Sequence, residues 1–296
     1  MNPEKPPANA VLSAVVAFGF WGVLPVYWKQ LGHLGSDVAL AQRVVWTMAV
    51  VLPVLMLSGE WVGFLRSVRD MRLFKAHAWS AFLLAINWGV FVWAAQHGRI
   101  LDCSLGYFIN PLLNVLIGNR MLGEKLSRLQ KLSIASAACG VVTQLVLVGR
   151  FPWIGLLLAG SFALYGLARR RSPLGSLPGL AMETVVGVPV AAAYLLWAQH
   201  SGAHIWGTAS SHDVLLITGL GIITTIPLLG FAHAARQLPF ALLGVLQFLA
   251  PTGQFLVGAL MYHEPIGTGA LVSFGLIWLG VLLFCSDLSM RKPGKA

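Results

Sequence analysis

Long apolar runs alternate with short polar segments along almost the whole chain. Each run holds roughly 20 residues, the length that an α-helix needs to cross the ~30 Å hydrocarbon core of a bilayer. We expect ten runs to form membrane-spanning helices: 9–31, 37–58, 76–97, 101–121, 129–149, 152–170, 177–199, 213–235, 239–262 and 267–286. Prolines inside several runs are compatible with this interpretation, because neighbouring helices can satisfy the backbone groups that proline leaves free. The predicted fold class is an all-α integral membrane protein.

Composition excludes the soluble classes. Of the 296 residues, 57% are hydrophobic and 10% are charged, whereas a soluble domain has about 45–50% apolar and about 25% charged residues. Disordered chains are poor in apolar residues, so that class is excluded as well. Cys103, Cys139 and Cys285 lie inside apolar runs and form no CxxC pair. They are expected to pack as small hydrophobic side chains, and no disulfide framework, metal or other cofactor is predicted.

Lysine and arginine are distributed unevenly between the predicted loops. With the N-terminus in the cytoplasm, the inner segments hold sixteen of the twenty lysines and arginines, and the outer loops hold three. Because positive charge concentrates in the cytoplasmic loops of membrane proteins, we expect both termini to be cytoplasmic. The net charge of +10 lies in short clusters between apolar runs. It forms no stripe interleaved with aromatic residues, so nucleic acid is not an expected partner.

The second half of the chain repeats the first at an offset of 140 residues. The aligned pairs include Pro111 and Pro251, Gly118 and Gly258, Glu124 and Glu264, and Gly140 and Gly280. Residues 9–149 and 152–286 are therefore predicted to form two five-helix repeats, flanked by the tails 1–8 and 287–296. Since five is odd, the second repeat enters the membrane from the opposite face, as in many secondary transporters. The alternative is an old duplication that is retained only for packing.

Several segments resemble a known family. They are 20–29 (FWGVLPVYWK), 42–46 (QRVVW), 107–112 (YFINPL), 161–166 (SFALYG) and 250–252 (APT). These segments are similar to those of the RarD proteins in the EamA-type drug/metabolite transporter superfamily, and the resemblance covers nearly the whole chain. It implies a bacterial inner-membrane permease with ten helices in two EamA-like repeats and both termini inside. It does not imply a particular substrate.

Two charged side chains, Arg43 and Glu183, stand out inside predicted spans, and the 140-residue offset aligns them. A charge in the membrane costs about 2.5–3.5 kcal/mol on insertion scales unless it is paired or hydrated. Each lies ~9 Å into its span from opposite faces, so a direct pair is not expected. Arg43 is predicted either to bind an anionic group of the substrate or to lock to a backbone carbonyl or to Asp102. Glu183 is predicted to be a gate or coupling group, or a structural contact of the nearby arginine cluster, Arg169, Arg170 and Arg171.

A polar face recurs in the fourth and ninth spans. Tyr107, Pro111 and Asn114 share one helix face by their spacing, and Asn110 borders it. The offset repeats this face at Gln247, Pro251 and Gln254. Two interpretations remain open for these amides, which either line a central cavity or hold helices together. Proline frees a carbonyl one turn back, which adds a polar group at mid-depth.

Aromatic side chains form a third set of candidates. Trp21, Trp88 and Tyr165 lie deep in their spans, with Asn87 beside Trp88, and are predicted to contact a substrate with a flat or apolar part. The alternative is an interfacial belt, which is the expected role of the tryptophans near span ends. Those tryptophans are Trp28, Trp61, Trp153 and Trp206.

These observations favour a secondary transporter that moves a small metabolite or an amphipathic or aromatic compound by alternating access, in the export direction. Its expected partners are the lipid bilayer and that small molecule, and its oligomeric state is left as monomer or dimer. The alternatives are a membrane-embedded enzyme and a membrane scaffold. The sequence contains neither an HExxH motif nor a Walker A motif, so catalysis and ATP-driven pumping are not expected. His200, His204 and His212 flank a glycine-containing loop and are not expected to bind metal.

Overall fold

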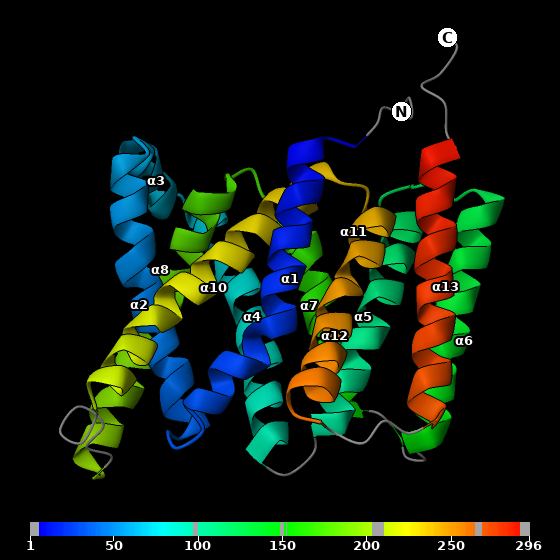
Figure 1. Cartoon of the computed structure of the whole chain (residues 1–296). Helices are drawn as coiled ribbons and strands as arrows, with labels where there is room; N and C mark the ends of the chain where they lie inside the picture. Colours follow the sequence, from blue (N-terminus) through cyan, green and yellow to red (C-terminus); the bar gives the residue numbers. More distant parts are fainter. Residues whose placement is uncertain are drawn as a thin grey trace.

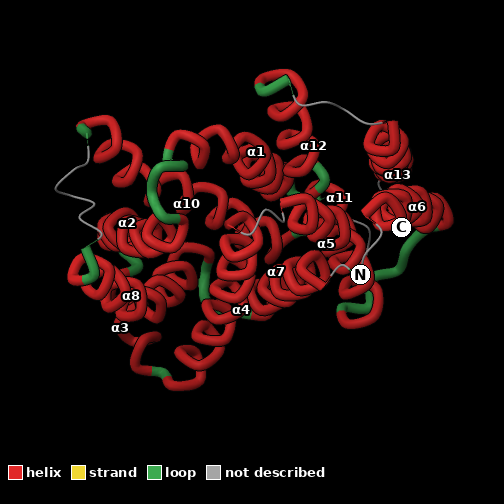
Figure 2. The backbone as a smooth tube through the Cα atoms, turned by 90° about the horizontal axis from the view of Figure 1, so that it is seen from below, coloured by secondary structure: helices red, strands yellow, loops and turns green. Residues whose placement is uncertain are grey.

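The computed structural model describes residues 6–96, 100–148, 151, 153–202, 210–263 and 268–290. In these ranges every regular element is a helix (Figures 1 and 2), so the all-α prediction is confirmed there. The elements are α1 (Ala8–Gln30), α2 (Ser36–Leu57), α3 (Trp61–Arg69), α4 (Met71–Gln96), α5 (Ile100–Met121), α6 (Arg128–Val148), α7 (Trp153–Arg171), α8 (Ser176–His200), α10 (Ser211–Gln237), α11 (Phe240–Gln247), α12 (Leu249–Leu256), η1 (Val257–Met261) and α13 (Thr268–Met290).

Each of the ten predicted ranges contains helix. By length and composition, six helices in the described part of the chain are able to cross a membrane. They are Ala8–Gln30, Asp37–Leu57, Ser176–His200, Ser211–Gln237, Phe240–Met261 and Leu271–Leu288. Helices α4 to α7 occupy the other four predicted ranges. The chain is therefore a multi-pass membrane protein, and its described part is all-helical.

Two features differ from the sequence-based expectation. Residues 61–69 were expected in a loop, but they form the short amphipathic helix α3, which buries Phe64 and ends in Arg66 and Arg69. The predicted ninth span is not one regular helix, since α11 ends at Gln247, α12 follows, and the π-helix η1 closes the segment. Pro251 lacks the N–H that a regular helix would donate to the carbonyl of Gln247, which accounts for the break at that point.

The helices form an antiparallel bundle in which α1 begins and α13 ends at the same end, the upper end in Figure 1. Helices α6 and α13 lie together at one edge of the bundle, and α2, α3 and α8 lie at the opposite edge (Figures 1 and 2). Between these edges, α1, α4, α7 and α10 surround an aromatic core. Its members include Phe18, Phe162, Tyr165 and Phe231, with the ring centroids of Phe162 and Phe231 4.9 Å apart.

We call two helices counterparts when the 140-residue offset aligns them. Most contacts between two helices have an equivalent contact between their counterparts. Helix α1 contacts α10 and α12, while its counterpart α7 contacts α4 and α5. Likewise α2 contacts α10, and its counterpart α8 contacts α4. Three further contacts join helices that are each other's counterparts: α2 with α8, α5 with α11, and α6 with α13. The pattern of neighbours is therefore nearly the same when viewed from either half.

Two hydrogen bonds between α6 and α13 show the same equivalence between the halves. The Ser133 hydroxyl donates to the carbonyl of Gly280 at 2.6 Å, and the Ser273 hydroxyl donates to the carbonyl of Gly140 at 2.8 Å. The 140-residue offset aligns Ser133 with Ser273 and Gly140 with Gly280, so the two hydrogen bonds are equivalent. The helices approach so closely here that both positions require glycine. A Cβ at Gly140 would lie 2.7 Å from the backbone carbonyl oxygen of Ser273, and a Cβ at Gly280 would lie 2.6 Å from that of Ser133.

Candidate functional site

Arg43 lies in the first turns of α2 and is 7% exposed. Its guanidinium lies over the indole ring of Trp88 from α4, a cation–π arrangement that arginine favours. Its Nε is buried and has no hydrogen-bond partner. None of the ion pairs among the described residues involves Arg43. The alternative partner Asp102 has a side chain that lies outside the described part of the chain.

Glu183 in α8 occupies the equivalent position of the second half and has a full set of partners. Oε1 accepts from the Ser80 hydroxyl at 2.6 Å and from Nη1 of Arg169 at 3.5 Å, and Oε2 accepts from the Tyr165 hydroxyl at 3.2 Å. Nδ1 of His77 lies 3.6 Å from Oε1. These groups come from α4 and α7, so the carboxylate joins both halves of the chain. We call this set the Glu183 network.

Arg169 is the least exposed charged residue of this network, at 0%. Besides Glu183, it donates to the carbonyls of Ser176 at 2.9 Å and Gly175 at 3.4 Å at the start of α8. Its guanidinium occupies the space beside Gly179, where a Cβ would meet Nη1 at 1.9 Å. The glycine therefore makes room for the arginine. The sequence indicated a contact between Glu183 and the arginine cluster, but it gave no sign of His77 or Ser80.

Further polar contacts close the same end of the bundle. Arg170 donates to the carbonyl of Ala235 at 3.0 Å, and Arg236 donates to that of Ser172 at 2.5 Å. The carboxylate of Glu124 accepts from the backbone N–H groups of Phe240 at 2.6 Å and Ala241 at 3.0 Å. It thereby satisfies two free donors at the N-terminus of α11, where negative charge is favourable. This cap links the loop after α5 to the other half.

Contacts between the halves also occur at the opposite, lower end. The Tyr27 hydroxyl donates to the carbonyl of Leu216, and the Tyr194 hydroxyl donates to Asp37. His33 lies 3.1 Å from Asp213 at the start of α10. These contacts are more exposed than the Glu183 network; the His33 side chain, for example, is 53% exposed. The halves are thus held together at both ends of the bundle.

The predicted amides all bridge helices. Asn87 donates to the carbonyl of Leu158 at 2.8 Å, and Asn110 donates to that of Ala159 at 2.6 Å. Asn114 donates to Oε1 of Gln247 at 2.7 Å, across the boundary between the halves. Gln254 donates to the carbonyl of Trp21 in α1 at 3.2 Å. In this conformation they serve as interhelical contacts, and their lining of a cavity stays a prediction. Asn114 keeps Oδ1 buried without a partner.

The predicted aromatic residues fall into two groups. Trp21 and Tyr165 belong to the aromatic core, where Trp21 contacts Phe162 at 5.4 Å between centroids and Tyr165 stacks on Phe231 at 5.9 Å. Trp88 and Tyr107 lie by contrast near Arg43: Trp88 lies under its guanidinium, and Tyr107 is its electrostatic neighbour. Trp88 also packs against the aromatic core, so it lies between that core and the buried cation.

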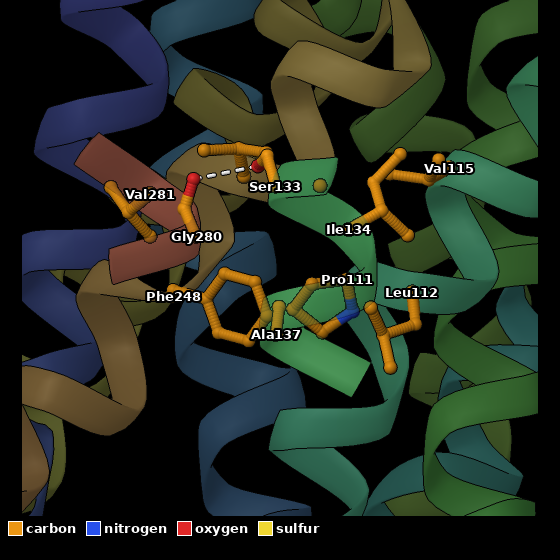
Figure 3. A pocket seen from close by; sticks show the side chains of 11 residues that line it. Pro111, Leu112, Val115, Ser133, Ile134, Ala137, Phe248, Gly280 and Val281 are labelled. Atoms are coloured by element: carbon orange, nitrogen blue, oxygen red, sulfur yellow. Dashed lines mark hydrogen bonds between the residues drawn. The ribbon is translucent and has the colours of Figure 1, made fainter. Parts of the chain in front are cut away.

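One small cavity lies between α5, α6, α11 and α13 (Figure 3). It measures about 10 Å³, close to the lower limit for a single water molecule. Its lining is largely apolar, with Leu112, Ile134 and Val281 among the residues. None of the predicted substrate-binding residues lines it. The described residues contain no group of three His, Cys, Asp or Glu able to hold a metal ion, and His204 lies outside them.

Comparison with known proteins identifies the class to which this bundle belongs. No family model matches the chain. A solved crystal structure shares the fold, with a TM-score of 0.71 at 19% identity, over 96% of this chain and 99% of the other. The chain is 40% identical to the uncharacterized transporter YojE of Bacillus subtilis, over 97% of each protein. It is 37% identical to the protein RarD of Escherichia coli, over 98% of this chain and 99% of that one. The chain belongs to the RarD family, as its sequence motifs indicated.

Proposed function

We propose that this chain is a secondary transporter of a bacterial inner membrane. It exports a small metabolite or an amphipathic or aromatic compound by alternating access. Ten helices cross the membrane as two inverted repeats, 9–149 and 152–286, with both termini in the cytoplasm. The relatives are named transporters, which supports this class over an enzyme or a scaffold. Neither a cofactor nor a metal is required.

The exchange of contacts between the halves carries the proposal. The bonds from Ser133 to Gly280 and from Ser273 to Gly140 are equivalent under the 140-residue offset. Reciprocal bonds of this kind are expected from a local two-fold axis, and an axis in the membrane plane relates inverted repeats. The reciprocal pairing of the other helices supports the same symmetry. A scaffold has no need of two interchangeable halves.

Alternating access requires that the halves separate at one end while they stay closed at the other. Contacts join the halves at the upper end, as between Glu183 and Ser80, and at the lower end, as between His33 and Asp213. Either set can therefore keep one end closed while the other end opens. We assign Glu183 the role of a gate at the cytoplasmic end, since it joins α8 to Ser80 and His77 of the other half. The substrate contacts in the proposal are Arg43, Trp21, Asn87, Trp88, Tyr107, Asn110, Asn114, Tyr165, Gln247 and Gln254.

Topology gives the most direct test. Reporter fusions after residues 72 and 171 should report a cytoplasmic location, and a fusion after residue 206 should report a periplasmic one. A cytoplasmic signal after residue 206 contradicts the inverted repeat. Counterflow in proteoliposomes then separates a carrier from a channel or scaffold, because only a carrier transiently accumulates labelled substrate against its gradient while unlabelled substrate leaves.

The central cavity has its own test. Single cysteines at Asn110, Asn114, Gln247 and Gln254 should react with a small water-soluble thiol reagent from at least one side of the membrane. Alternation exposes these positions when one end of the bundle opens. If all four stay unreactive in a folded protein, the amides only hold helices together.

A further inference from the structure

Arg43 is a buried cation whose donors are incompletely used. It is 7% exposed, its Nε has no acceptor, and no carboxylate among the described residues pairs with it. The buried acids among the described residues have other partners: Glu183 lies with Arg169, and Asp287 accepts from the Ser127 hydroxyl at 2.7 Å. Arg169 also leaves its Nε unpaired, but its terminal nitrogens contact a carboxylate and two backbone carbonyls. Among the described residues, Arg43 is thus the one buried arginine that has no carboxylate partner within the described part of the chain.

The position of Trp88 limits how a ligand can reach this cation. The indole covers one face of the planar guanidinium, so a polar ligand approaches along an edge. The edge formed by Nε and one terminal nitrogen presents two parallel N–H donors. A carboxylate accepts both in a bidentate pair, which a single-point cation such as lysine cannot offer. The unused Nε lies on this edge.

The surroundings of the edge favour a flat ligand body. Trp88 and Tyr107 lie beside Arg43, and the ring of Phe91 lies 6.3 Å from that of Tyr107 between centroids. We propose that the substrate is an aromatic or other planar organic carboxylate, bound through its carboxylate by the Nε edge of Arg43 and through its ring by Trp88 and Tyr107. This inference rests on the proposed transport function and specifies its substrate class.

Benzoate and benzamide are suitable probes, because they match in ring and size and differ in charge. Binding to the purified full-length protein is measured by thermal shift and by calorimetry. Benzoate at millimolar concentration should raise the melting temperature, since a ligand of the folded state stabilises it. Benzamide should raise it much less. A shift that is equal for both probes, or absent for both, overturns the proposal.

Variants locate the binding group. Arg43→Gln should abolish the benzoate shift, and Arg43→Lys should weaken benzoate binding by about tenfold or more because the bidentate edge is lost. Arg120→Gln, at an exposed position in the last turn of α5, is the control and should bind benzoate as the parent does. If Arg43→Gln does not fold, Arg43→Lys decides, and undiminished benzoate binding in that variant overturns the proposal.

Three outcomes distinguish a failure of this inference from a failure of the transport proposal. Counterflow of a neutral compound, with no benzoate binding, leaves a transporter whose substrate is not an anion. Benzoate binding that appears only in Asp102→Asn identifies Arg43 as locked by that residue in the parent and overturns the ligand assignment. A periplasmic reading after residue 72 contradicts the transport architecture, whichever probe binds.

Discussion

Arg43 and Glu183 occupy equivalent positions in the two halves, yet their surroundings differ in kind. Glu183 has hydrogen-bond donors on both oxygens and a buried arginine beside it, with partners from α4 and α7. Arg43 lies over an indole ring, and its Nε has no partner. The 140-residue offset therefore aligns two buried charges whose environments differ.

This difference indicates a division of roles. A charge whose partners are all supplied by the protein stabilises the conformation in which those partners meet. A charge whose donors are unused is destabilising by itself, because burial without a partner costs free energy, and it remains available to a ligand. We therefore expect changes at the Glu183 network to act mainly on stability and changes at Arg43 to act mainly on transport.

Glu183→Ala is expected to cause the largest loss. It leaves the fully buried Arg169 without its carboxylate, and breaking a buried pair from one side costs about 3–5 kcal/mol. The melting temperature of the purified protein should fall strongly. Glu60→Ala, which removes an exposed acid at the start of α3, is the control and should change it little. Equal melting temperatures for the two variants contradict the assignment of the network as a structural closure.

Gly179→Ala tests the same network without removing a charge. The added Cβ falls 1.9 Å from Nη1 of Arg169, the nitrogen that contacts Glu183, so the guanidinium must move from its present position. Such overpacking costs about 1–3 kcal/mol. Gly19→Ala in α1 is the matched control, since nothing lies within 4 Å of the new methyl group there. A stability loss that is the same at both positions shows that glycine replacement, and not the network, is responsible.

The α6–α13 contact allows a test of the symmetry itself. Ser133→Ala and Ser273→Ala each remove one interhelical hydrogen bond, worth about 0.5–1.5 kcal/mol. Because the two bonds are equivalent, the losses should be equal within error, and together they should exceed either one. Thr143→Ala removes a hydroxyl that bonds only within its own helix and should cost less. Clearly unequal losses at the two serines argue against a local two-fold axis.

The contrast between Arg43 and Glu183 also marks the limit of what the sequence predicts. Helix positions followed from apolar length alone, as in the span predicted at 37–58 and observed as Ser36–Leu57. The arginine cluster beside Glu183 was evident because it is close in sequence. His77 and Ser80 are about one hundred residues away and reach Glu183 only through the packing of α4 on α8. No local pattern encodes that contact.

Arg43→Gln should have the smallest effect on stability and a complete effect on transport. Glutamine is neutral, so the variant removes a buried charge that lacks a described counter-ion and retains a polar group over Trp88. The melting temperature should therefore stay the same or rise, since an unpaired buried charge opposes folding. Substrate counterflow should be lost, because glutamine cannot supply the bidentate edge of a guanidinium. Arg43→Lys, which retains charge but not geometry, should keep partial transport. Measuring both quantities on the same preparations decides the comparison: a fall in melting temperature as large as that of Glu183→Ala makes Arg43 a structural lock, and intact counterflow removes it from the site.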